Sequence, residues 1–381
     1  MALGTILCRP LVQAQEPQHS QQVLQLCAEY SDLGDLLTAS VFDRSFSISI
    51  ARPTGQVVSL TGNIPEAVTP SVPATWIAAC QLAVSPASDY AALAMLNAGG
   101  FVIELIDLAT GKLAHEVLVP NKFSTRPVQL RQCRVGFINH TGQLAVAQLH
   151  YLPTGEPEIA TVLVNDDGSI VPLPSNVIGP RYTEISSSSF DFLGGRVWFL
   201  CPAYSARIDR QPRCTLTSAS LLDATASSPK IPPPPDDRVV GSGQPNLGFL
   251  SSGDAMLLAQ RRIWLYHFAD SSFRQMNLPE TPRHIRWVEF PGPPKFTSDG
   301  HFAAVPVSMF HYPLFREGQV SHGTKVVILE VPSLHVVETI QHPGKGSLVD
   351  LAVHNDGRQL TLAASWGEGW QSFQVPTNGA P

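Results

Sequence analysis

Residues Cys80–Pro120 have the sequence CQLAVSPASDYAALAMLNAGGFVIELIDLATGKLAHEVLVP, and this stretch decides the fold class. It contains four short apolar runs, separated by segments rich in Ser, Pro, Asn, Asp and Gly. Apolar runs of this length, bounded by turn-forming residues, predict β-strands joined by hairpins. The predicted strands are Cys80–Val84, Tyr90–Leu96, Phe101–Ile106 and Lys112–Val119. One small sheet leaves both faces uncovered, so we expect similar sheets to pack against it.

The same unit recurs along the chain with a period of about 50 to 60 residues, which is the scale of propeller blades. Each copy has a first strand, a turn of Ser, Asn, Asp or Gly, a strand rich in small residues, and a second hairpin. Small side chains suit strands that crowd toward a central axis. The seven expected copies cover approximately residues 22–62, 76–120, 131–174, 185–225, 246–279, 294–342 and 346–376.

The turns of these copies resemble those of the WD-repeat and YVTN-like β-propeller superfamily. Ser298-Asp299-Gly300 and Asn355-Asp356-Gly357 match the family's SPDG-like first turn. Asp107-Leu108-Ala109-Thr110-Gly111 matches its V-x-D-x-x-T-G turn between the last two strands. The likeness covers nearly the whole chain, although the Trp-Asp dipeptide of true WD repeats is absent. The resemblance implies a fold and not an activity. That fold is an all-β, seven-bladed β-propeller of four-stranded antiparallel blades, forming a single domain.

The two ends of the chain bear on how such a ring would close. The seventh copy shows only three strands, so we expect residues Leu3–Val12 to supply the outer strand of the last blade. An alternative stays open, because Val12-Gln13-Ala14 has the small-residue pattern of a signal-peptide cleavage site. Between the fourth and fifth copies, residues 227–237 have the sequence SSPKIPPPPDD and predict a polyproline linker.

Composition narrows the classes of partner. Hydrophobic residues make up 44% of the 381 residues, which is enough for a full core, and charged residues make up only 15%. The formal net charge of −6 and the lack of a Lys/Arg cluster argue against nucleic acid as a partner. No window of 18 apolar residues occurs, so the sequence predicts no transmembrane helix. The compartment, cytoplasmic or extracytoplasmic, and the oligomeric state are left open.

The six cysteines do not predict a metal site, because they are widely spaced and include no CxxC pair. Cys27, Cys80 and Cys133 each lie near the first strand of a copy, and we interpret them as core thiols. Cys201 and Cys214 flank a polar loop, and the sequence leaves open whether they pair across it, as an oxidising compartment would allow. We therefore predict neither a metal nor a cofactor.

Two segments have the composition of a contact surface. The first is an insertion in the sixth copy, Phe310–Thr324, which is rich in aromatic residues and carries an Arg, the side chains that dominate binding energy at interfaces. The alternative is an excursion that folds back over a blade edge. The second is a pair of Trp in the last copy, which would either stack on a flat ligand or cap the core. The candidate residues are His311, Tyr312, Phe315, Arg316, His322, Trp366 and Trp370.

These features favour a non-catalytic scaffold that presents loops and a central funnel to a protein or small-molecule ligand. The alternative is a propeller enzyme, such as a lactonase-like hydrolase, a lyase or a cyclase, with its active site in the funnel. Such a hydrolase needs Asp, Glu, Asn or His ligands for a metal on the first strands of several blades. Those positions are largely Ala, Val, Leu, Ser and Phe, and a GxSxG motif is absent. Catalytic residues are therefore not assigned.

Overall fold

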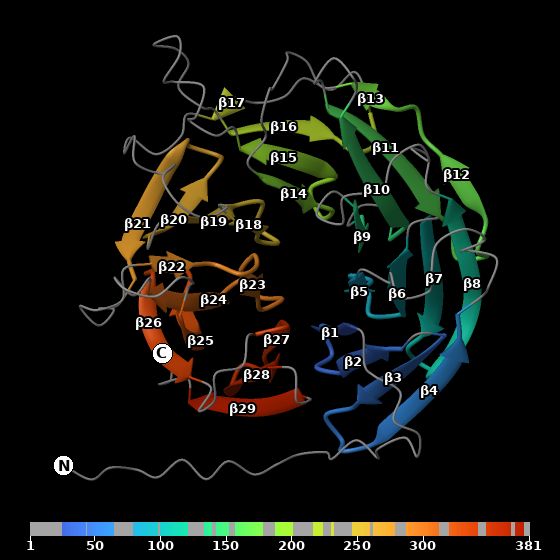
Figure 1. Ribbon diagram of the computed structural model, residues 1–381, viewed down its shortest axis with the longest axis horizontal. Coiled ribbons are helices and arrows are strands. Elements are labelled where there is room, and N and C mark those ends of the chain that lie inside the picture. Colours follow the sequence, from blue (N-terminus) through green and yellow to red (C-terminus); the bar gives the residue numbers. More distant parts are fainter. Residues whose placement is uncertain are drawn as a thin grey trace.

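The structure, a computed structural model, contains seven antiparallel sheets arranged in a ring around a central axis (Figure 1). Each sheet is one blade, and the blades follow one another in chain order. The fold is a seven-bladed β-propeller. The described residues are 25–42, 44–64, 79–97, 100–120, 133–138, 142–151, 157–177, 187–200, 216–223, 230–231, 246–259, 262–278, 287–311, 320–341, 348–366 and 370–376.

The first strand of each blade lies nearest the axis and the later strands lie progressively further out (Figure 1). Blade 1 consists of β1 (Gln25–Tyr30), β2 (Leu36–Val41), β3 (Ser45–Ala51) and β4 (Val57–Asn63). Blade 2 consists of β5 (Ala79–Val84), β6 (Tyr90–Asn97), β7 (Gly100–Asp107) and β8 (Lys112–Pro120). Blade 3 consists of β9 (Cys133–Phe137), β10 (Leu144–Tyr151), β11 (Pro157–Val164), β12 (Ile170–Pro172) and the short β13 (Asn176–Val177).

Blade 4 consists of β14 (Ser187–Asp191), β15 (Arg196–Leu200), β16 (Leu216–Ser220) and β17 (Lys230–Ile231). Blade 5 consists of β18 (Asn246–Phe249), β19 (Ala255–Ala259), β20 (Arg262–His267) and β21 (Ser272–Asn277). Blade 6 consists of β22 (Trp287–Glu289), β23 (Lys295–Phe296), β24 (Phe302–His311), β25 (Val320–Glu330) and β26 (His335–Gln341). Blade 7 consists of β27 (Asp350–Asn355), β28 (Gln359–Ser365) and β29 (Trp370–Pro376).

The predicted turns form where the sequence placed them. Gly300 and Gly357 in the first turns and Gly111 in an outer turn all have positive φ, between 63° and 82°. A residue with a β-carbon rarely adopts this backbone conformation, which explains the Asp-Gly and Thr-Gly pairs of these turns. We call the face of the ring that carries the first turns of the blades the turn face.

Apolar packing joins the blades because both faces of each sheet are covered by a neighbour. In blade 2, Val102 and Ile106 pack on blade 1, whereas Phe101 and Ile103 pack on blade 3. The alternation of side chains along a strand produces these two apolar faces from one continuous apolar run. Similar clusters join blades 3 and 4, blades 4 and 5, blades 5 and 6, and blades 6 and 7.

The seam between blade 7 and blade 1 is different, because the described residues form no apolar cluster across it. Successive side chains along a strand point to opposite faces of the sheet, and rows of small and polar side chains therefore face this seam. On blade 1 the rows are Thr38–Ser49–Ser59 and Ser40–Ser47–Thr61. On blade 7 they are Ala352–Ala363–Ser372 and His354–Thr361–Gln374. Contacts across this seam between described residues include the hydrogen bond from the Ala28 amide to Asp350 and the stacking of Tyr30 on His354, so we call it the polar seam. The predicted closing strand, Leu3–Val12, lies outside the described residues and stays a prediction.

Two predicted boundaries were wrong. Lys230–Ile231 pairs with β16 as the outer strand of blade 4, so the segment 227–237 is not a linker throughout. An outer strand tolerates nearby Pro because its far edge makes no ladder hydrogen bonds. Blade 6 begins at Trp287 rather than near residue 294, since both β22 and β23 pair with β24. Pro291, Pro293 and Pro294 lack amide hydrogens and separate the two short strands.

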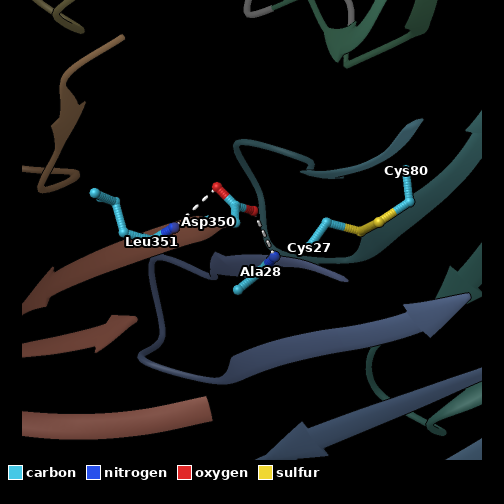
Figure 2. The surroundings of a disulfide bond; sticks show 5 residues. All are labelled: Cys27, Ala28, Cys80, Asp350 and Leu351. Carbon is cyan, nitrogen blue, oxygen red and sulfur yellow. Dashed lines mark hydrogen bonds between the residues drawn. A yellow bond between two sulfur atoms is a disulfide. The ribbon is translucent and has the colours of Figure 1, made fainter. Parts of the chain in front are cut away.

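The interpretation of Cys27 and Cys80 as core thiols was also wrong. The two residues form a disulfide between β1 and β5, with their Cα atoms 6.0 Å apart (Figure 2). Sequence spacing did not indicate this pair, because the first strands of neighbouring blades approach one another only when the ring forms. Cys201 and Cys214 lie outside the described residues, so the question of their pairing stays open.

Candidate functional site

The first strands bring three charged side chains together near the axis. Lys295 of β23 donates a hydrogen bond from Nζ to Glu29 Oε2 of β1 at 2.7 Å, which joins blade 6 to blade 1. Asp350 of β27 accepts hydrogen bonds from the backbone amides of Ala28 and Leu351, both at 2.9 Å (Figure 2). We call Glu29, Lys295 and Asp350 the axial ionic cluster.

The charged groups of this cluster change one another's pKa values. Burial alone would lower the pKa of Lys295, but the nearby carboxylates of Glu29 and Asp350 outweigh it and raise that pKa. Burial raises the pKa of Asp350, and the Lys295 charge and the two amide hydrogen bonds oppose that shift. Lys295 is therefore held as a cation, and both carboxylates have a partner within the ring. The axial ionic cluster therefore connects blades 6 and 7 to blade 1, at the polar seam where the ring closes.

Replacing Lys295 by Met is expected to lower the free energy of unfolding by roughly 2 kcal/mol. The substitution removes the cation that is paired with Glu29 and lies near Asp350. The loss is smaller than for a fully buried pair because the side chains of Lys295 and Glu29 are 30% and 27% exposed, so water screens them. Chemical denaturation of Lys295→Met, Glu29→Gln and the double variant measures the coupling energy. A coupling energy near zero would show that the ion pair does not hold the seam.

Polar contacts also link the first turns of neighbouring blades on the turn face. Ser251 Oγ donates to Ser298 O at 3.3 Å, Asn355 Nδ2 donates to Asp299 Oδ2 at 2.7 Å, and the Asp32 amide donates to Ser88 Oγ at 3.1 Å. Tyr30 stacks on His354 across the seam, with ring centroids 5.4 Å apart. This face is therefore a belt of short turns fixed to one another, from blade 5 around to blade 2.

The predicted site residues that the structure describes lie at the opposite end of blades 6 and 7. β24 and β28 both start at the turn face and run away from it, so their far ends lie on the other face. His311 ends β24 and pairs with Val320, and His322 lies in β25 where the pairing register shifts. Trp370 starts β29 opposite Ser365. Tyr312, Phe315 and Arg316 lie outside the described residues.

Trp366 is placed in the core between blades 6 and 7. It is 5% exposed and makes an edge-to-face contact with Phe373, with ring centroids 5.7 Å apart. This position agrees with the core-capping alternative for Trp366. The structure does bring the two predicted segments to the same face of neighbouring blades, which the sequence alone did not indicate.

The described ends of the predicted insertion, Phe310–His311 and Val320–Thr324, continue the blade 6 hairpin. β24 and β25 have 10 and 11 residues, whereas the corresponding strands of the other blades have five to eight. β24 and β25 are about two to three residues longer than the longest of those strands. At about 3.3 Å per residue, this lengthens the hairpin by roughly 7–10 Å. β22 pairs with the far part of β24, at Ser308–Phe310, and β23 pairs with the near part. We call Ser308–His311 with Val320–Thr324 the blade 6 ribbon.

Sequence reasoning missed the axial ionic cluster, because it treated the first strands as essentially apolar. Glu29, Lys295 and Asp350 are each the single Asp, Glu, Lys or Arg of their strands. Glu29 and Lys295 also occupy the same place in their blades, two residues before the residue whose amide starts the first turn. The sequence signal that could have revealed the cluster was a single charged residue at the same position of the first strand in two blades.

Comparison with known proteins identifies the fold only. No protein-family model matches the chain, and no curated protein matches it. A chain of the mitotic checkpoint complex matches 99% of this chain and 98% of its own length, with 10% identity and a TM-score of 0.50. Kuenenia stuttgartiensis hydrazine synthase matches 97% of this chain and 100% of its own length, with 10% identity and a TM-score of 0.52. Dihydro-heme d1 dehydrogenase NirN in complex with DHE matches 93% and 67%, with 12% identity and a TM-score of 0.47.

The described residues contain no helix long and apolar enough to cross a membrane. They also contain no group of three His, Cys, Asp or Glu side chains arranged to hold a metal ion. The charged side chains found near the axis are instead paired with one another or with backbone amides.

Proposed function

We propose that this protein is a non-catalytic scaffold that binds a protein partner through the blade 6 ribbon and the adjoining edge of blade 7. The observation that carries the proposal is the lengthened hairpin of β24 and β25, whose described strands are longer than the corresponding strands of the other blades. The fold itself does not decide between binding and catalysis, since similar folds occur both in a mitotic checkpoint complex and in hydrazine synthase.

The base of the ribbon is built as a rigid support. Ser308 and Thr324 are 6% and 2% exposed, and their hydroxyl groups lie 3.2 Å apart across the two strands. β22 adds a third strand beside β24 at this height. A rigid base lowers the entropy that is lost when a projecting segment is fixed by a partner.

The sequence at the end of the ribbon fits this role. Residues 312–319 between β24 and β25 are YPLFREGQ, and they include Tyr312, Phe315 and Arg316. Large aromatic and Arg side chains supply most of the binding energy at protein interfaces, while their neighbours exclude water. We assign partner contact to these residues and, on blade 7, to Trp370.

The double variant Phe315→Ala/Arg316→Ala is expected to weaken partner binding by roughly 30-fold, because loss of an interface anchor costs about 2 kcal/mol or more. The tagged wild-type protein and the variant are used to capture partners from an extract of the native source, with quantification by mass spectrometry. Leu33→Ala is the matched control, since Leu33 is 70% exposed on the turn face. Equal capture by all three proteins, with unchanged melting temperatures, would refute the proposal.

A further inference from the structure

The outer strand of blade 1, β4, lies on the perimeter of the ring (Figure 1). Among the described strands it pairs with β3 alone, and the register runs from Ala51 opposite Val57 to Ser45 opposite Asn63 without a shift. Its sequence, VVSLTGN, contains no charged residue and no Pro. A regular, uncharged edge strand readily pairs with another strand, and proteins usually protect such edges with charges, Pro, bulges or short length.

The fourth strands of the other blades carry this protection. β8 contains Lys112 and Glu116, β26 contains Glu338, and both have a register shift against the third strand. β21 contains Arg274, and β12 and β17 have only three and two residues. β29 of blade 7 is also uncharged, but it is a third strand, where we expect the closing strand to pair. Among the described fourth strands, β4 is therefore the unprotected one.

The hydrogen bonds of the β3–β4 hairpin show which backbone groups of β4 face outward. The Arg52 amide donates to Gln56 O at 2.8 Å, and the Ile64 amide donates to Arg44 O at 2.9 Å. In an antiparallel ladder, such pairs alternate with pairs whose amides and carbonyls point away from each other. The even-numbered residues of β4 therefore bond to β3, and the odd-numbered residues face outward. The outward-facing residues, whose side chains are also exposed, are Val57, Ser59, Thr61 and Asn63.

A second copy of β4 matches this row of outward groups along its whole length. Antiparallel pairing of two copies about a two-fold axis at Leu60 places Val57 opposite Asn63. It also places Ser59 opposite Thr61. Each outward amide and carbonyl then meets its counterpart on the other copy, and no charge on either strand opposes the approach. An interface formed by the same patch on both subunits is the commonest kind in homo-oligomers.

We propose that this protein forms a two-fold dimer by antiparallel pairing of β4 with β4 of a second copy. The surface lies on blade 1 and is separate from the blade 6 ribbon, so the dimer is independent of partner binding by the ribbon. A single pair of strands makes an interface at the small end of specific ones, below about 1,200 Å². We therefore expect a dimer that dissociates on dilution.

Sedimentation velocity of the full-length protein over a wide range of concentration tests the dimer. The variant Ser59→Lys/Thr61→Lys places Lys opposite Lys in two cross-strand pairs, and we expect it to weaken dimerisation by roughly 10-fold or more. Thr339→Lys/Gln341→Lys is the matched control, because these residues are likewise exposed and two apart on a fourth strand, β26. We expect this control to dimerise as wild type does.

A charge-swapped pair of variants tests the register. Ser59→Glu/Thr61→Glu is expected to dimerise as poorly as the Lys variant when alone. Mixing the two variants is expected to restore dimerisation, because each Lys then lies opposite a Glu. A wild-type protein that stays monomeric at every concentration would overturn the inference. So would equal dimerisation of the Lys variant and wild type, or a mixture of the two variants that stays monomeric.

Discussion

Removing the Cys27–Cys80 disulfide is expected to lower the free energy of unfolding by about 4 kcal/mol in the chain-entropy model. The two cysteines are 53 residues apart in the sequence, so the bridge closes a long loop in the unfolded chain. In the folded protein it joins the first strands of blades 1 and 2, beside the seam across which the described residues form no apolar cluster. The variant Cys27→Ala/Cys80→Ala, compared with wild type by urea denaturation, measures the loss.

Cys133→Ala is the matched control for the disulfide, because Cys133 lies in the first strand of blade 3 and is not part of the bridge. We expect Cys133→Ala to lower the free energy of unfolding much less than the double variant does. Counting of free thiols in the denatured, unreduced protein tests the bridge directly. If Cys27 and Cys80 both react with a thiol reagent under these conditions, the bridge and the predicted loss are refuted.

Replacing Glu104 by Gln is expected to stabilise the protein above neutral pH by roughly 3 kcal/mol relative to wild type. Glu104 is 3% exposed in β7 and faces the apolar cluster between blades 1 and 2, on the same side as Val102 and Ile106. Burial, together with the negative charge of Glu116 opposite it on β8, raises the pKa of Glu104 from 4.5 to about 7. Ionised Glu104 is therefore unfavourable in the folded protein.

The sign of the pH dependence follows from this raised pKa. Below pH 4.5 the carboxyl group is protonated in both states, and its contribution to stability is fully present. As the pH rises to about 7, the unfolded chain releases its proton more readily than the folded protein, and this contribution is lost. Denaturation of wild type and Glu104→Gln from pH 4 to 8 measures the effect. A stability difference that does not change with pH would contradict it.

Glu116→Gln serves as the control for the Glu104 prediction. Glu116 is exposed, and its charge is the smaller of the two causes of the raised pKa. Its removal is expected to move the pH-dependent loss of stability to lower pH without abolishing it. A Glu116→Gln variant that behaves as Glu104→Gln would show that charge repulsion, and not burial, controls this interface.

The fold could be predicted from the sequence because its signals are local. The four strands predicted in Cys80–Pro120 agree with β5–β8 to within one residue at each end, and Gly300 and Gly357 mark the first turns. The contacts near the axis could not be predicted in the same way. Glu29 and Lys295 are 266 residues apart, and only closure of the ring brings them together.

The candidate surface was predicted in part. Its residues were chosen for their aromatic and Arg composition, and composition does not show that Phe310, His311 and Val320–Thr324 continue a hairpin. The almost continuous apolar run of β24, FAAVPVSMF, is longer than an ordinary blade strand, and this was the signal to extend it. The burial of Trp366 depends on its contacts with blade 6 and with Phe373, which the sequence does not reveal.

The most direct test of the scaffold proposal is site-specific photo-crosslinking. A photoreactive phenylalanine is placed at Phe315, and in a separate protein at Leu33, which is 70% exposed on the turn face. Both proteins are irradiated in extract of the native source, and the adducts are identified by mass spectrometry. We expect one protein to be captured from position 315 and not from position 33. Capture of the partner from position 33, with none from position 315, would contradict partner binding by the blade 6 ribbon.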